Sequence, residues 1–152
     1  MLIEKISDRD NLPYQLLLLA DETTDAIDKY IYDSAVYIAK ENAGDEPIGV
    51  YALQQVNTAT IEIKNMAVCK TFQNKGIGRL LINSAVAQAK EDGYSEIIVG
   101  TADAGTRQLR FYKNNGFEIF DIKKDFFVNH YPQPIYEYGT QLRDMIMLRK
   151  QI

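Results

Sequence analysis

Hydrophobic residues recur at two different periods along the chain, and the change between them marks its main structural unit. Ile61, Ile63 and the run 66–68 form an apolar segment of strand length in which β-branched side chains are well represented. A turn around Gly76–Gly78 follows, and apolar residues then return at helical spacing as far as Glu91. These helical positions are Leu80, Leu81, Val86 and Ala87. Residues 59–91 therefore predict a strand, a glycine turn and a long amphipathic helix.

The residues before this unit predict one strand, two helices and a hairpin. Asn11 caps a first helix that has Pro13 in its first turn, and Thr24 or Asp25 caps a second helix that ends near Ser34. The side chains expected to face the core are Leu16, Leu17 and Leu19 in the first helix, and Ile27, Tyr30 and Ile31 in the second. Strands are predicted at Leu2–Ile6, Ala35–Lys40 and Ile48–Val56, with a polar turn at 41–46.

After the long helix, strands and helices alternate. Asp92 and Gly93 end that helix, and Gly116 ends the next one. The predicted elements are a buried strand at Glu96–Thr101, a helix at Thr106–Asn115, and strands at Phe117–Ile122 and Asp144–Arg149. An aromatic segment, Phe126–Tyr138, separates the last two strands. No linker or repeat interrupts this order, so residues 1–152 predict a single domain.

Composition and charge narrow the class of protein. With 46% hydrophobic and 25% charged residues, the 152-residue chain can form an ordinary globular core without disulfides. The formal net charge of −4 argues against a surface that coats nucleic acid. Cys69 stands alone, no secretory signal precedes the charged run 7–10, and the apolar run 16–20 is too short to span a bilayer. We expect a cytoplasmic protein with neither a membrane nor a nucleic-acid partner.

The glycine turn has the features of an anion site. A strand ends in glycines that open a helix, which presents unpaired backbone N–H groups at the positive end of the helix dipole. Lys75 and Arg79 add positive charge beside it, either as phosphate contacts or as solvated surface charges. No Walker A string occurs, and the third position of a dinucleotide fingerprint is Leu81. Two interpretations stay open: a pyrophosphate cradle, or a glycine turn without a ligand.

Two motifs resemble those of the GNAT acetyltransferase superfamily. Gln73, Gly76 and Gly78 fit its Q-x-x-G-x-G pyrophosphate signature. Downstream, Phe111-Tyr112 and Gly116-Phe117 fit its F-Y-x-x-x-G-F segment, where a helix ends and a strand begins. The order of elements is similar to that of the family over essentially the whole chain, as in a small single-domain bacterial-type member.

The resemblance implies an α+β fold of α/β/α layers around a mixed, mostly antiparallel sheet. The sheet would be splayed at an acetyl-CoA site. It also implies an N-acetyltransferase that moves the acetyl group of acetyl-CoA to a primary amine by direct attack in a ternary complex. The acceptor would be a small-molecule or peptide amine, and no metal would be required.

The same resemblance implies which residues hold the co-substrate acetyl-CoA. Backbone groups of Met66, Ala67 and Val68 would pair with the pantetheine arm and stabilise the oxyanion. The family carries an asparagine after the next strand, a position where Thr101 or a backbone group takes its place here. The turn residues expected to receive the pyrophosphate are Gln73, Asn74, Lys75, Gly76, Ile77, Gly78 and Arg79.

Two side chains carry the implied proton transfers. Tyr112 occupies the position of the family tyrosine that protonates the departing thiolate, and its alternative role is that of a core aromatic. Glu62 lies where several members of the family carry a catalytic base, and its alternatives are a surface pair with Lys64 or a base role taken by water. His130, in the aromatic segment, is assigned to packing or surface rather than to catalysis. The acidic residues 21–28 either attract an amine or form a solvated helix end.

Two functions of other classes compete with the transferase. One is a non-catalytic module that binds or senses acyl-CoA. The other is a dimeric interaction protein whose aromatic segment is the functional surface. The presence of both Tyr112 and Glu62 favours the enzyme, and the aromatic segment makes a homodimer an additional expectation.

Overall fold

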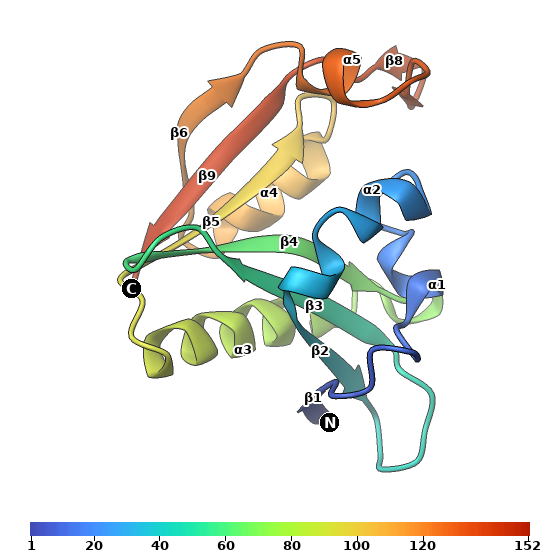
Figure 1. Cartoon of the computed structure of the whole chain (residues 1–152), viewed down its shortest axis with the longest axis vertical. Helices are drawn as coiled ribbons and strands as arrows, with labels where there is room; N and C mark the ends of the chain where they lie inside the picture. Colours follow the sequence, from blue (N-terminus) through green and yellow to red (C-terminus); the bar gives the residue numbers. More distant parts are fainter.

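A mixed seven-stranded sheet forms the centre of the computed structural model, which describes residues 1–152 (Figure 1). Its strand order is β1-β2-β3-β4-β5-β9-β6, and every neighbouring pair is antiparallel except the parallel pair β4–β5. The strands are β1 (Leu2–Lys5), β2 (Ala35–Lys40), β3 (Gly49–Gln55), β4 (Thr60–Val68), β5 (Glu96–Ala102), β6 (Glu118–Lys123) and β9 (Met145–Gln151). A separate small ribbon pairs β7 (Tyr136–Glu137) with β8 (Thr140–Gln141).

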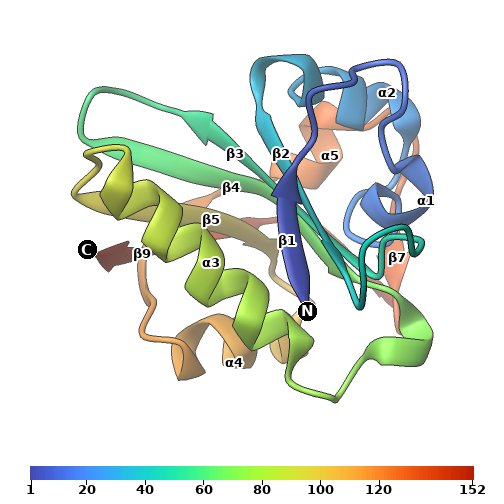
Figure 2. The same cartoon turned by 90° about the horizontal axis from the view of Figure 1, so that it is seen from below.

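Helices cover both faces of this sheet, as the two views in Figures 1 and 2 show. On one side lie α3 (Ile77–Glu91) and α4 (Thr106–Asn114), and on the other lie α1 (Tyr14–Leu17), α2 (Thr24–Asp28) and α5 (Phe126–His130). Two 3₁₀ turns, Ile31–Asp33 and Lys70–Phe72, complete the set. The expected α+β fold of α/β/α layers is confirmed, and no helix has the length and apolar character needed to cross a membrane.

Strand alternation divides the core into two apolar clusters. In β3, Tyr51 and Leu53 belong to the cluster under α3 and α4, whereas Val50 and Ala52 belong to the cluster under α1 and α2. Because both faces are buried, the central strands carry apolar residues at consecutive positions rather than alternate ones.

The parallel pair β4–β5 stays together over only part of its length. Pairing runs from Thr60 opposite Glu96 to Ile63 opposite Val99, and there it ends, although both strands continue. At this point β4 carries one extra residue against β3, because Leu53 pairs with Ile63 while Ala52 pairs with Asn65. Such a bulge bends a strand. The two strands diverge in Figure 1, and the expected splay of the sheet is confirmed.

The core-facing residues predicted for α3 and α1 differ in part from those in the structure. The buried positions of α3 are Ile77, Leu81, Ile82, Ala85 and Ala89, whereas Leu80 is 48% exposed and Ala87 is exposed. The helix begins at Ile77, inside the glycine turn, so the inward row counts from Ile77 in steps of four. Leu19 is also exposed, because α1 ends at Leu17.

The predicted helix caps and one aromatic segment also need correction. The α2 cap is Thr23, whose Oγ1 accepts a hydrogen bond from Ala26 N at 3.0 Å, and not Thr24 or Asp25. No side chain caps α1, so the predicted Asn11 cap is wrong. The aromatic segment contains the helix α5, which the sequence did not predict, and the N-cap Asp125 of this helix forms no side-chain cap.

Tyr51 predicts a loss of stability at high pH. Its ring stacks on Tyr37 with 4.8 Å between centroids and its hydroxyl lies 2.7 Å from Ser84 Oγ. Burial raises its pKa to about 12, although the bond to Ser84 opposes the rise. Above pH ~10 the unfolded chain loses this proton while the folded chain keeps it. The free energy of unfolding then falls by about 1.4 kcal/mol per pH unit for this group until the folded pKa is reached.

Denaturant unfolding as a function of pH checks this expectation. Tyr51→Phe reduces the slope above pH ~10, while Tyr138→Phe, at a position that is 90% exposed, leaves the slope unchanged. Equal slopes in the wild type and in Tyr51→Phe would contradict the assignment.

Candidate active site

The turn between β4 and α3 presents a row of backbone N–H groups. Asn74 and Gly76 have positive φ values of 62° and 82°, and Gly76 is the N-cap of α3. The N–H groups of residues 77–79 precede the first intrahelical hydrogen bond, which Leu80 N donates to Gly76 O. No side chain caps this end, and nothing lies within 4 Å of where a Cβ of Gly76 would stand. The helix end is therefore open to an anion.

Side chains hold this turn in place from two directions. Gln73 Nε2 donates to Val68 O at 3.0 Å, which ties the turn to the end of β4. Arg107 Nη2, from the first turn of α4, donates to Asn74 Oδ1 at 2.9 Å. Sequence reasoning missed Arg107, because one arginine at the start of a helix matches no motif. Lys75 and Arg79 are both exposed beside the turn.

The two sequence motifs meet in space. A Cβ on Gly78 would stand 3.2 Å from Cε1 of Phe111, closer than such contacts ordinarily are. Glycine at this position lets α3 lie directly against the aromatic ring of α4. The motif glycine thus has a packing role, and α4 is fixed against the start of α3.

Tyr112 lies on the α3 and α4 face of the sheet. Its ring packs edge-on against Phe111 and Phe117, at centroid distances of 5.1 and 5.5 Å. It belongs to the same apolar cluster as Ile77, and Met66 packs against that cluster. Burial raises the pKa of Tyr112 far above its usual range.

The splay leaves backbone groups of β4 without a strand partner. Cys69 N donates to Ile48 O at 2.8 Å, so residues 67 and 69 turn their backbone groups toward β3. By alternation, Met66 and Val68 turn theirs toward the gap that β5 has left. On the far side of this gap, Thr101 is buried at 7% exposure and its Oγ1 donates to Ala102 O at 3.2 Å.

A cavity of about 270 Å³ lies on the opposite face of the sheet. Glu62 lines it with a side chain that is 17% exposed, and its Oε1 lies 3.6 Å from Lys64 Nζ. Lys64 Nζ in turn lies 5.4 Å from the ring centroid of Tyr30. The pair with Lys64, an alternative considered for Glu62, is present. The remaining lining residues are Asp21, Ala26, Lys29, Gln54, Ile63, Gly100, Lys123, Phe126, His130, Tyr131 and Met145.

Asp21 ties two walls of this cavity together. Its Oδ1 accepts hydrogen bonds from Tyr131 OH at 2.9 Å and Glu22 N at 2.7 Å, and its Oδ2 accepts one from Tyr30 OH at 3.0 Å. Burial and then the Asp21 charge raise the pKa of Tyr131. Tyr30 OH also accepts a bond from Asn65 Nδ2 at 3.0 Å. Of the acidic residues 21–28, only Asp21 lines the cavity.

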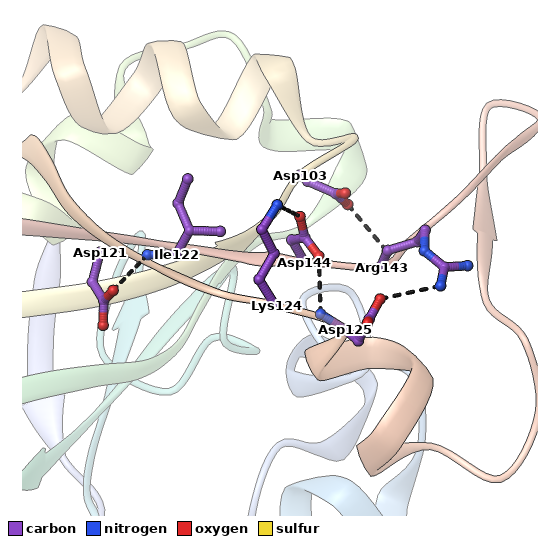
Figure 3. Close-up of polar contacts among 7 residues, drawn as sticks. All are labelled: Asp103, Asp121, Ile122, Lys124, Asp125, Arg143 and Asp144. Atoms are coloured by element: carbon purple, nitrogen blue, oxygen red, sulfur yellow. Dashed lines mark hydrogen bonds and ion pairs between the residues drawn. The ribbon is translucent and has the colours of Figure 1, made fainter.

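A polar cluster at the base of α5 fixes the third wall (Figure 3). The Asp144 carboxylate accepts hydrogen bonds from Asp125 N at 2.9 Å and Lys124 Nζ at 3.2 Å, and the first of these lowers the pKa of Asp144 most. Arg143 Nη2 donates to Asp125 Oδ1 at 3.1 Å, and Arg143 N donates to Asp103 Oδ1 at 3.2 Å. These bonds set where α5 begins, and thereby where its later residues stand. His130 stacks on Phe126 at 4.2 Å, as its packing assignment expects, yet it also lines the cavity.

The sequence and the fold of this chain are similar to those of a known protein family. The sequence pattern of the Acetyltransferase (GNAT) family matches residues 4–117. The chain belongs to the GNAT family. Its members are acetyltransferases, so the sequence resemblance and the enzyme class are both confirmed.

Individual relatives match over nearly the whole chain. YvbK of Bacillus subtilis, named as an uncharacterized N-acetyltransferase, is 43% identical over 135 residues, which cover 89% of this chain and 86% of YvbK. A GNAT acetyltransferase from Elizabethkingia anophelis, solved with acetyl-CoA bound, has 41% identity and a TM-score of 0.94 over 99% of this chain and 97% of its own. A Bacillus cereus protein described as an IAA acetyltransferase has 41% identity and a TM-score of 0.92 over 99% of each chain.

No group of three or more His, Cys, Asp or Glu side chains is arranged to hold a metal ion. Cys69 accepts or donates a weak bond with Thr71 Oγ1 at 3.6 Å, which lowers its pKa.

The hydrogen bonds to Asp21 predict how much the Tyr131 hydroxyl contributes to stability. Tyr131→Phe removes one donor to a carboxylate, and we expect the free energy of unfolding to fall by about 1.5–3 kcal/mol. Tyr136→Phe serves as the control, because Tyr136 is 64% exposed and should change stability by less than about 0.5 kcal/mol. Denaturant titration measures both values. A Tyr131→Phe variant as stable as the control would show that the tie contributes nothing.

Proposed function

We propose that this chain transfers the acetyl group of acetyl-CoA to a primary amine by direct attack in a ternary complex. One observation carries the proposal: β4 and β5 separate beyond Ile63 and Val99, between an open helix end on one face and a cavity on the other. The relative with acetyl-CoA bound supports the assignment of the co-substrate. A small-molecule or peptide amine would enter from the cavity side.

In this proposal, two sets of backbone groups bind different parts of acetyl-CoA. The N–H groups of the turn 74–79 would bind the diphosphate at the positive end of α3. The backbone groups of Met66 and the N–H of Val68 would pair with the pantetheine arm, which takes the place of the missing strand partner, while Val68 O stays bonded to Gln73 Nε2. A backbone N–H in this stretch would also donate to the oxyanion that forms at the thioester carbon.

The proposed chemistry then needs two proton transfers. The amine nitrogen bonds to the thioester carbon and gives up one proton, which Glu62 accepts directly or through a water molecule. The carbon–sulfur bond breaks as the oxyanion collapses, and Tyr112 donates its proton to the departing sulfur. Burial raises the pKa of Tyr112 and so keeps the phenol protonated before the transfer, and the same burial would raise the pKa of the departing thiol. Bulk water restores both groups afterwards.

The two rival functions predict different experimental results. A module that only senses acyl-CoA would bind acetyl-CoA and release no thiol with any amine. An interaction protein would bind no acetyl-CoA and would form dimers through its aromatic segment. Homodimerisation of the enzyme itself stays a prediction.

Two glycines with similar positive φ values provide a matched test of the cradle. Gly76 and Gly93 have φ values of 82° and 90°, and neither has an atom within 4 Å of a Cβ position. Alanine at either residue costs about 1 kcal/mol of left-handed strain. Only Gly76→Ala also places a methyl group at the proposed diphosphate site, and we expect its Kd for acetyl-CoA to rise about tenfold.

Calorimetric titration of acetyl-CoA measures this difference. Gly93→Ala should unfold more easily than the wild type and keep its Kd within about twofold. An unchanged affinity of Gly76→Ala for acetyl-CoA would show that this turn does not bind the diphosphate.

Tyr112→Phe tests the acid role. We expect kcat for acetyl transfer to fall about a hundredfold or more, because general acid catalysis contributes on that scale, while acetyl-CoA still binds. Glu62→Gln should lower kcat as well, and by less if water carries the proton. Tyr94→Phe, at a half-buried tyrosine just beyond the far end of α3, is the control. Thiol release at wild-type rates in Tyr112→Phe would refute the assignment.

A further inference from the structure

The cavity that would receive the amine carries an excess of positive charge. Three lysines line it, Lys29, Lys64 and Lys123, against two carboxylates, Asp21 and Glu62. The chain as a whole has a formal net charge of −4, so this excess does not follow from composition. A site made only for a cationic amine would be expected to show the opposite balance.

Both carboxylates of the cavity already have partners. Asp21 accepts three hydrogen bonds, from Glu22 N, Tyr30 OH and Tyr131 OH. Glu62 lies 3.6 Å from Lys64 Nζ. Asp21 is therefore occupied in holding the walls, and the charge of Glu62 is balanced by that of its neighbour.

Lys29 and Lys123 form no ion pair with either carboxylate of the cavity. Of the five ion pairs in the chain, one lies in this cavity, between Lys64 and Glu62, and the other four lie elsewhere. The two lysines stand on opposite walls, Lys29 directly after α2 and Lys123 at the end of β6. Lys123 Nζ lies 6.0 Å from the ring centroid of Phe126, which keeps its ammonium group beside the cavity.

The size and the other walls limit what can occupy this space. A volume of about 270 Å³ lies just below the usual range for ligand sites, and Tyr30, Phe126 and Tyr131 give the cavity aromatic surface. The lining contains no arginine, so its free positive charge comes from lysine ammonium groups, which bind anions as point charges. In so small a cavity, a carboxylate is the compact anionic group that leaves room for an amine and an apolar body.

We propose that the acceptor is a small amine that also carries a carboxylate, of the size of an apolar amino acid, and that Lys29 and Lys123 bind this carboxylate. The inference rests on the proposed function for the position of the amine, which lies at Glu62. The two lysines then act on acceptor choice and not on the transfer step itself.

Matched pairs of acceptors test the charge requirement. L-Phenylalanine and L-leucine are each compared with their primary amides, which keep the amine and the apolar body and lose the negative charge. We expect kcat/KM to favour the acids by about tenfold or more, the scale of a hydrogen bond to a charged group. The amides have less basic amines, of which more is neutral near pH 7. This difference works against the expected result, so a preference for the acids is a stringent outcome.

Variants assign the preference to the two lysines. Lys29→Gln and Lys123→Gln should each reduce the acid-to-amide ratio of kcat/KM about tenfold, and raised salt should reduce it in the wild type. Lys90→Gln removes the same charge from the exposed last turn of α3, and its ratio should match that of the wild type. A preference for the amides, or equal ratios in all four proteins, would overturn the inference.

A binding measurement separates this inference from the proposed function. The same acids and amides are titrated calorimetrically into the protein saturated with coenzyme A, which requires no turnover. Lys-dependent binding of the acids without thiol release from acetyl-CoA would support the acceptor site and refute the transferase. Acetyl transfer to acids and amides alike, unchanged in both lysine variants, would support the transferase and refute the acceptor class.

Discussion

The separation of β4 from β5 is the constraint on which the rest of the site depends. Backbone N–H and C=O groups in the middle of a sheet ordinarily pair with a neighbouring strand, and leaving them unpaired is costly. Here an extra residue at Lys64 bends β4 just where its pairing with β5 stops. The backbone groups of Met66 and the N–H of Val68 are then available to a partner that is not protein, whereas Val68 O accepts from Gln73 Nε2. Pantetheine amides have the right chemistry to be that partner.

The sheet keeps two kinds of chemistry on separate faces. Under α3 and α4, the ring of Phe111 packs on Gly78 and holds Tyr112 in an apolar cluster. Under α1, α2 and α5, polar side chains surround a cavity that contains Glu62. The proposed acid and base therefore face each other only through the gap in the sheet. In the proposed reaction, a buried phenol and a partly exposed carboxylate would act from opposite sides of the gap.

Polar contacts between residues far apart in the sequence build the cavity. They engage charged side chains that sequence reasoning would assign to substrate binding. Asp21 bonds to Tyr131 across 110 residues of chain, and the Asp144 cluster fixes the start of α5. The carboxylates near the cavity thus form structural hydrogen bonds or ion pairs, while Lys29 and Lys123 form no ion pair. The proposed preference for a carboxylate-bearing acceptor rests on this balance of free charge and not on the count of charged residues.

The sequence by itself determined the order of most strands and helices, the family, and the turn where α3 begins. These follow from local patterns: apolar periods along the chain, and glycines where the backbone must adopt positive φ, as at Gly76. Tertiary structure alone decided the inward face of α3, the helix α5, the contact of Arg107 with Asn74, and the walls around Glu62. Each of these joins residues far apart in the chain, and such contacts leave no periodic signal, because their partners are chosen only when the elements pack.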